Sequence, residues 1–113
     1  MTEAAGPPLL NIQGANIAAR SATITSFIES LQMAIDRPII DRTGLTGTFN
    51  FELHWRPDNT QFRGRGGQFP AASDPNRADL FTAMLQQLGL RLEPQNRATN
   101  VIVVDLAEKP AGN

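Results

Sequence analysis

The stretch TFNFELHWR, residues 48–56, decides the fold because apolar and polar side chains alternate strictly along it. Its large apolar residues occupy every second position: Phe49, Phe51, Leu53 and Trp55. Its polar residues occupy the positions between them: Asn50, Glu52, His54 and Arg56. A period of two is the spacing of a β-strand that buries one face and wets the other. We therefore predict a strand whose apolar face covers a core.

Amphipathic helices are predicted before and after this strand. Ser21 or Thr23 is the expected N-cap of the first, and Asp79 that of the second. The first predicted apolar stripe is Ile24, Phe27, Ile28, Leu31 and Ile35. The second predicted apolar stripe is Leu80, Phe81, Met84, Leu85 and Leu88. Pro38 and Gly89 follow the two stripes, and these residue types are typical of positions just beyond a helix.

Further strands are predicted at residues 9–17, 38–41, 90–94 and 101–104. The last of these is apolar on both faces, which is typical of a central strand. The predicted order is strand, helix, strand, strand, helix, strand, strand. This order favours an α+β fold in which two helices pack on one face of a small mixed sheet. We expect the apolar face of residues 48–56 to pack against Phe27, Leu31, Phe81 and Leu88.

The chain has 113 residues, the size of a single domain. Residues 1–8 are expected to be a flexible lead-in, residues 9–107 a single α+β domain, and residues 108–113 a frayed tail. Within the domain, residues 57–78 are rich in Gly, Pro and polar residues and are predicted to form a long loop. We expect this loop to be a connector that contributes little to folding.

Composition excludes several classes of function. The chain has no cysteine, which excludes disulfides, thiolate zinc sites and cysteine nucleophiles. A net charge of -1 provides no general attraction to nucleic acid or anionic lipid, so neither is expected as a partner. No apolar run is long enough to span a membrane, and the chain begins without a signal-peptide pattern. No cofactor or metal is expected.

His54 is the only histidine and the main candidate for catalysis. One interpretation is a small hydrolase of esters or phosphoesters in which His54 is a general base and Glu52 or Asp58 the nearby carboxylate. Ser73 or a water molecule would then be the nucleophile. We favour the other interpretation, a solvated histidine on the polar face of a strand.

Arg63 and Arg65 stand in a glycine-rich segment between Phe62 and Phe69, a pattern that could bind RNA or an acidic partner. Residues 56–79 contain four arginines and three aspartates, a net charge of only +1, which attracts phosphate groups weakly. Nucleic acid is therefore not expected, and the two arginines are kept as candidates for protein binding.

Two segments of the chain carry a family resemblance. The first is residues 37–53 with Trp55 and residues 57–58; the second is residues 80–83, 87–93, 101–105 and 108–110. They resemble the C-terminal half of a soil-associated, Solibacter-type family of uncharacterised proteins of Acidobacteria. Members of that family usually carry a secretion signal, so the resemblance implies an extracytoplasmic location. More distantly, the order of elements is similar to the short N-terminal domain of secretins and TonB-dependent receptors, which implies a periplasmic docking role.

The hypothesis we favour is a non-catalytic docking module. It would bind a protein or peptide through a sheet edge, or through the polar face of the strand at residues 48–56. Candidate binding residues are Asn50, Glu52, His54, Arg56, Arg63 and Arg65. A second copy of the chain, paired as a homodimer through a sheet edge, is among the expected partners. The alternative remains the small hydrolase that uses His54.

Overall fold

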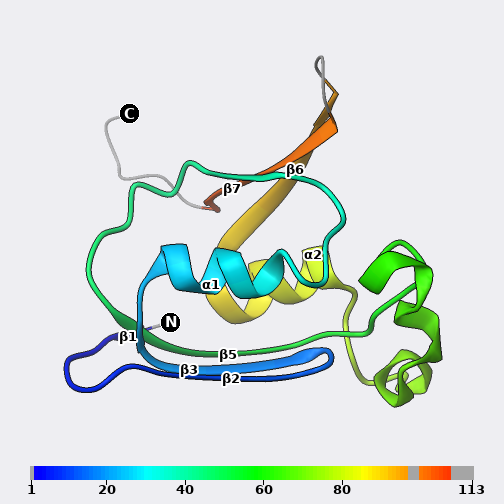
Figure 1. Ribbon diagram of the computed structural model, residues 1–113, viewed down its shortest axis with the longest axis horizontal. Coiled ribbons are helices and arrows are strands. Elements are labelled where there is room, and N and C mark those ends of the chain that lie inside the picture. Colours follow the sequence, from blue (N-terminus) through cyan, green and yellow to red (C-terminus); the bar gives the residue numbers. More distant parts are fainter. Residues whose placement is uncertain (1, 97–99, 108–113) are drawn as a thin grey trace.

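The computed structural model of the chain describes residues 2–96 and 100–107 and contains two β-sheets (Figure 1). The first is a four-stranded antiparallel sheet in the order β1-β5-β3-β2. Its strands are β1 (Thr2–Glu3), β2 (Leu9–Gln13), β3 (Asn16–Ala22) and β5 (Phe49–His54). The second is a three-stranded mixed sheet in the order β4-β7-β6. Its strands are β4 (Ile39–Asp41), β6 (Leu90–Asn96) and β7 (Asn100–Leu106).

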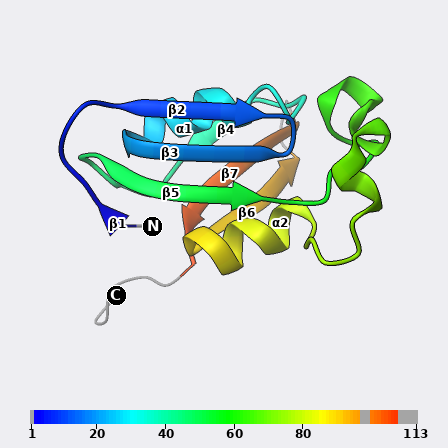
Figure 2. The same cartoon turned by 90° about the horizontal axis from the view of Figure 1, so that it is seen from below.

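The helices lie on one side of the four-stranded sheet, and the second sheet lies on that side too (Figures 1 and 2). They are α1 (Ile24–Leu31), α2 (Leu80–Ala83) and the π-helical turn η4 (Met84–Leu88), which continues α2. Thr23 and Asp79 cap their N-termini as predicted, each side chain accepting a backbone N–H three residues on, at 3.1 and 2.8 Å. Gly89 ends η4 in the left-handed region, with φ of 68°. Among the described residues, no helix or strand covers the other face of the four-stranded sheet (Figures 1 and 2).

The α+β class is confirmed, with two sheets where the sequence predicted one. The predicted strand at residues 9–17 is instead a hairpin of β2 and β3, because Gly14 adopts φ of 55° and turns the chain. Thr2–Glu3, in the predicted flexible lead-in, pairs with β5 as β1. The predicted frayed tail, residues 108–113, lies outside the described residues. β7 is central, as its apolar faces predicted, and pairs in parallel with β4 and antiparallel with β6.

The alternation along β5 is confirmed. Phe49, Phe51, Leu53 and Trp55 are all buried, and the polar residues between them are exposed. One core cluster contains these four side chains together with Phe27 and Leu31 of α1 and with apolar residues of β3, β6, β7 and the second helix.

The predicted apolar face of the second helix is partly wrong. Phe81 and Leu85 are 41% and 48% exposed, whereas Leu80, Met84 and Leu88 are buried. Leu80, Met84 and Leu88 are spaced four residues apart and form the buried centre of the stripe, whereas Phe81 and Leu85 lie on its flank. The expected contribution of Phe81 to the core is therefore absent.

Residues 57–78 are more ordered than a connector. They contain three short 3₁₀ turns: η1 (Phe62–Gly64), η2 (Gly66–Gln68) and η3 (Pro70–Ser73). The indole N–H of Trp55 donates to Oε1 of buried Gln61 at 2.9 Å, and the Phe62 ring stacks on the indole with centroids 6.1 Å apart. A Cβ added at Gly66 would collide with the carbonyl oxygen of Asp58, which shows how closely the chain folds back. Gln61 and Phe62 thus contact the buried Trp55, and whether the loop contributes to folding stays a prediction, tested below by its replacement.

Within the described residues, no helix is long and apolar enough to cross a membrane.

Candidate functional site

The uncovered side of the four-stranded sheet, called here the outer face, carries the candidate binding residues of β5. It is the side turned toward the viewer in Figure 2. Strand register places side chains of three strands next to one another on it: Asn50, Glu52 and His54 of β5, Asn16, Ala18 and Arg20 of β3, and Leu9, Asn11 and Gln13 of β2. Arg20 and Glu52 are both exposed, so the face carries charges of both signs. The small side chain of Ala18 leaves a shallow hollow of about 240 Å³ between Asn11 and His54.

His54 is oriented by an asparagine of the neighbouring strand. Asn16 donates from Nδ2 to the backbone carbonyl of Gln13 at 3.0 Å, which turns its Oδ1 toward Nδ1 of His54 at 2.9 Å. A carbonyl oxygen only accepts, so in this arrangement Nδ1 of His54 carries the proton. Nε2 lies 3.8 Å from Oε2 of Glu52, and the two side chains are 45% and 73% exposed. The predicted pair of Glu52 and His54 is therefore adjacent, on an open surface.

The backbone of His54 is held by a residue that the sequence did not indicate. Its N–H donates to Oε1 of Gln87 at 2.9 Å, and its carbonyl accepts from Nε2 of Gln87 at 2.8 Å. Gln87 lies on η4, so its side-chain amide occupies the place that a neighbouring strand would take along β5. Together with β1, which pairs at Phe49 and Asn50, this amide occupies the two ends of the β5 edge that faces away from β3.

Replacing Gln87 by alanine is expected to lower the free energy of unfolding by about 1–2 kcal/mol, because it removes two hydrogen bonds at a partly solvated edge. The matched control is Gln86→Ala, an exposed neighbour on the same turn, for which we expect a change within about 0.5 kcal/mol. Urea denaturation of both variants measures the difference. Equal midpoints would show that the amide is dispensable.

The other predicted site residues do not join His54. Asp58 accepts from the N–H of Thr60 at 2.8 Å and from its hydroxyl, and thereby stabilises a turn in the loop. Ser73 ends η3 in the same loop. In the part of the chain that the structure describes, neither residue has a hydrogen bond to His54. The predicted catalytic set is thus reduced to His54 and Glu52.

The predicted arginines are also dispersed. Arg56 follows β5 and is exposed, and its N–H donates to the carbonyl of Ala78 at 2.7 Å. Arg63 and Arg65 are exposed in the loop, which lies at one end of the molecule beyond the ends of the strands (Figure 2). The backbone N–H of Arg63 donates to Oδ2 of Asp36 at 3.0 Å. Arg63 and Arg65 therefore lie apart from Arg56, which lies just beyond the end of the strand that carries His54.

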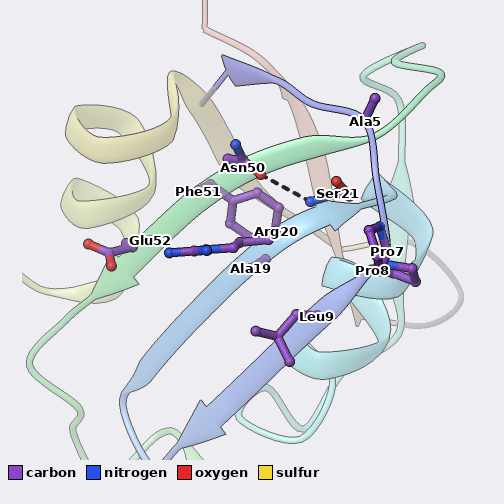
Figure 3. Close-up of a pocket in the computed structure, with 10 residues that line it drawn as sticks. All are labelled: Ala5, Pro7, Pro8, Leu9, Ala19, Arg20, Ser21, Asn50, Phe51 and Glu52. Atoms are coloured by element: carbon purple, nitrogen blue, oxygen red, sulfur yellow. Dashed lines mark hydrogen bonds between the residues drawn. The ribbon is translucent and has the colours of Figure 1, made fainter.

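At one end of the outer face, a bulge in β3 adjoins a concave pocket of about 920 Å³ (Figure 3). Ser21 has φ of 51°, a left-handed conformation that is costly for a residue with a side chain. Oδ1 of Asn50 accepts the N–H of Ser21 at 3.1 Å and holds the bulge in place. Arg20 and Glu52 line the pocket, and residues of the segment before β2 form its rim. Asn50, predicted as a binding residue, thus has a structural role as well.

At the other end, a groove of about 560 Å³ lies between the β2–β3 turn and the loop. Phe69, Pro70 and Ala71 provide its apolar lining. Arg77 lies beside them, and its Nη1 donates to the carbonyl of Trp55 at 3.3 Å while its Nε lies 3.4 Å from Oδ2 of Asp74. This groove was not predictable from the sequence, because it joins two segments separated by more than fifty positions in the chain.

A family model described as "Protein of unknown function (DUF3738)" matches residues 2–107 of the chain. The chain belongs to the DUF3738 family. Comparison with curated proteins and with solved structures gave no match. The family match spans every strand and helix from β1 to β7, so the outer face and both concave surfaces lie within the DUF3738 domain.

Proposed function

We propose that this DUF3738 domain is a non-catalytic docking module that binds an extended protein or peptide segment along its outer face. The observation that carries the proposal is the continuity of two surfaces. Gln13 and Asn16 line the polar hollow that contains His54, and they also line the groove beside Phe69. A single bound segment could therefore contact both.

The chemistry of the two surfaces is suited to a peptide. Amide side chains such as Asn11 and Gln13 both donate and accept, as the main chain of a peptide does. The groove offers an apolar lining to one side chain of that peptide, and apolar anchors in pockets supply much of the affinity of such contacts. The opposite charges of Arg20 and Glu52 favour a partner that carries both signs, because a partner of one sign would be repelled by one of them.

The resemblance to secretin and TonB-receptor docking domains, and with it an extracytoplasmic location, is part of the same proposal. If the resemblance holds, the docking partner belongs to a membrane-associated assembly. The binding experiment described next does not depend on this part of the proposal.

A random-peptide display experiment on the immobilised domain tests the proposal. We expect enriched peptides whose affinity falls about tenfold or more in Gln13→Trp, which places a ring at the junction of the two surfaces. Gln86→Trp is the matched control, since it adds the same ring at an exposed position on η4. Failure to enrich any peptide, or equal affinities for the two variants, would refute docking at this surface.

A second candidate function is the small hydrolase, and the orientation of His54 by Asn16 is the observation that favours it. An imidazole whose Nδ1 is held by an acceptor leaves Nε2 available as a base. Against it, the site is an open surface, and no serine or threonine hydroxyl in the described residues is hydrogen-bonded to that ring. We therefore place docking first.

Turnover of an activated ester separates the two candidates. We expect the purified domain to show no rate above background, and His54→Ala to change nothing. If the domain does hydrolyse the ester, and His54→Ala lowers the rate by about 100-fold or more while leaving the unfolding midpoint unchanged, the hydrolase replaces the docking module.

A further inference from the structure

β2 forms the open edge of the four-stranded sheet (Figure 2). It joins β3 through a two-residue turn between the paired residues Gln13 and Asn16. Residues that flank such a turn form a hydrogen-bonded pair, and the N–H and C=O groups of successive residues point to opposite sides of a strand. The backbone groups of Leu10 and Ile12 therefore point away from β3, toward the open edge.

The hydrogen bonds of His54 support this assignment independently. Asn16 pairs with His54 and Ile17 with Leu53 across β3 and β5. Backbone groups of successive residues point to opposite sides of a strand. If those of Asn16 point to β2, then those of Ile17 point to β5 and bond with Leu53. The backbone groups of His54, the neighbour of Leu53, must then point away from β3. They do so, since the backbone N–H and carbonyl of His54 are both bonded to Gln87.

The edge of β2 lacks the features that protect the other sheet edges. The edge of β5 is occupied at its two ends by β1 and Gln87, and β4 has only three residues. β6 carries Pro94 and the ion pair of Arg91 with Glu93 at 2.7 Å. β2 has the sequence LLNIQ, with no charge and no proline, and pairs with β3 without a bulge. An edge strand without such protection is a site for pairing with another strand.

We propose that β2 pairs antiparallel with β2 of a second copy of this chain, about a two-fold axis at Asn11. This arrangement sets Leu10 opposite Ile12 of the partner copy, and the two residues exchange backbone hydrogen bonds on both sides of the axis. A second copy is the occupant because the edge is complementary to itself. The outward backbone groups match in this register, two half-buried apolar side chains meet, and the strand has no charge that its copy would repel.

Two four-stranded sheets thereby join into one sheet of eight strands. The outer faces of the two copies become continuous, with Asn11 facing its own copy and Leu9 facing Gln13 of the partner copy. This inference goes beyond the proposed docking function, which requires only one copy.

Sedimentation over a range of protein concentrations tests the dimer. We expect a concentration-dependent mass of twice the monomer, and about tenfold weaker association in Asn11→Asp at low salt, since the two carboxylates would face each other across the axis. Asn76→Asp, the same change at an exposed loop position, is the control and should leave association unchanged. A protein that is monomeric at all concentrations would overturn the dimer, while peptide binding by that monomer would leave the docking function intact.

Single cysteines test the register, because the natural chain contains none. Asn11→Cys is expected to form a disulfide-linked dimer under mild oxidation, since directly opposed residues of a strand pair have Cβ atoms about 4.5–5.5 Å apart, close to the span of a disulfide. Leu9→Cys and Gln13→Cys should cross-link much more slowly, because each faces a different residue of the partner. Equal rates for all three would overturn the proposed axis.

Discussion

Truncation of Phe51 to alanine is expected to lower the free energy of unfolding by about 3–5 kcal/mol. Phe51 is only 6% exposed, and its ring meets that of Phe27 edge-on, with centroids 4.8 Å apart and an interplanar angle of 76°. The substitution leaves a cavity between β5 and α1, where both the burial of the ring and the aromatic contact are lost. Urea denaturation followed by circular dichroism gives the change.

The matched control is the next residue, Glu52, whose side chain is 73% exposed on the opposite side of the strand. Glu52→Ala should change the free energy of unfolding by no more than about 0.5 kcal/mol. An unchanged midpoint in Phe51→Ala, or an equal loss in both variants, would show that the two faces of β5 are wrongly assigned.

Replacement of residues 61–72 by a glycine–serine linker of equal length is expected to lower the free energy of unfolding by about 2–5 kcal/mol. The linker removes Gln61, so the indole N–H of buried Trp55 loses its acceptor, which costs about 1–3 kcal/mol. It also removes half-buried Phe62 from the face of that indole, which contributes about 1–2 kcal/mol more. The midpoint of urea denaturation measures the sum.

Arg65→Ala is the control for this replacement, because Arg65 lies in the same segment and is exposed. Its effect should stay within about 0.5 kcal/mol. If the linker variant unfolds at the midpoint of the natural chain, the loop is a passive connector after all.

The strand and helix patterns were predictable wherever one residue type repeated at one spacing. β5 has four large apolar residues at a strict period of two, and α1 keeps its stripe from Ile24 to Leu31, so local sequence determines both burial patterns. The N-caps at Thr23 and Asp79 were likewise readable, because a cap is a contact between residues three apart.

The division into two sheets was not predictable in this way. The parallel pairing of β4 with β7 joins Ile39 to Ile102, and no local pattern records such a distant partner. The exposure of Phe81 was not predictable either, because this residue lies on the flank of its apolar stripe, and distant segments of the chain determine how far the flank is covered. The turn at Gly14 could have been recognised from its glycine, since φ of 55° suits that residue type.

The residues that β5 contributes to the candidate site were predictable from the sequence, but their partners on other segments were not. The alternation of β5 was enough to indicate Asn50, Glu52 and His54 as solvated neighbours. Their partners Asn16 and Gln87 come from segments 38 and 33 positions away, so only the folded chain brings them together.

Because Trp55 stacks on Phe62 of the loop, its fluorescence is expected to report on the position of the loop. Trp55 is the single tryptophan, and the sequence contains no tyrosine, so intrinsic fluorescence arises almost entirely from one indole. That indole is fully buried and donates its hydrogen to a loop side chain. Any event that lifts residues 61 and 62 away would expose it to water and shift its emission to longer wavelength. Opening of the loop could therefore be followed in real time in unlabelled protein, and its response to a ligand in the adjoining groove recorded directly.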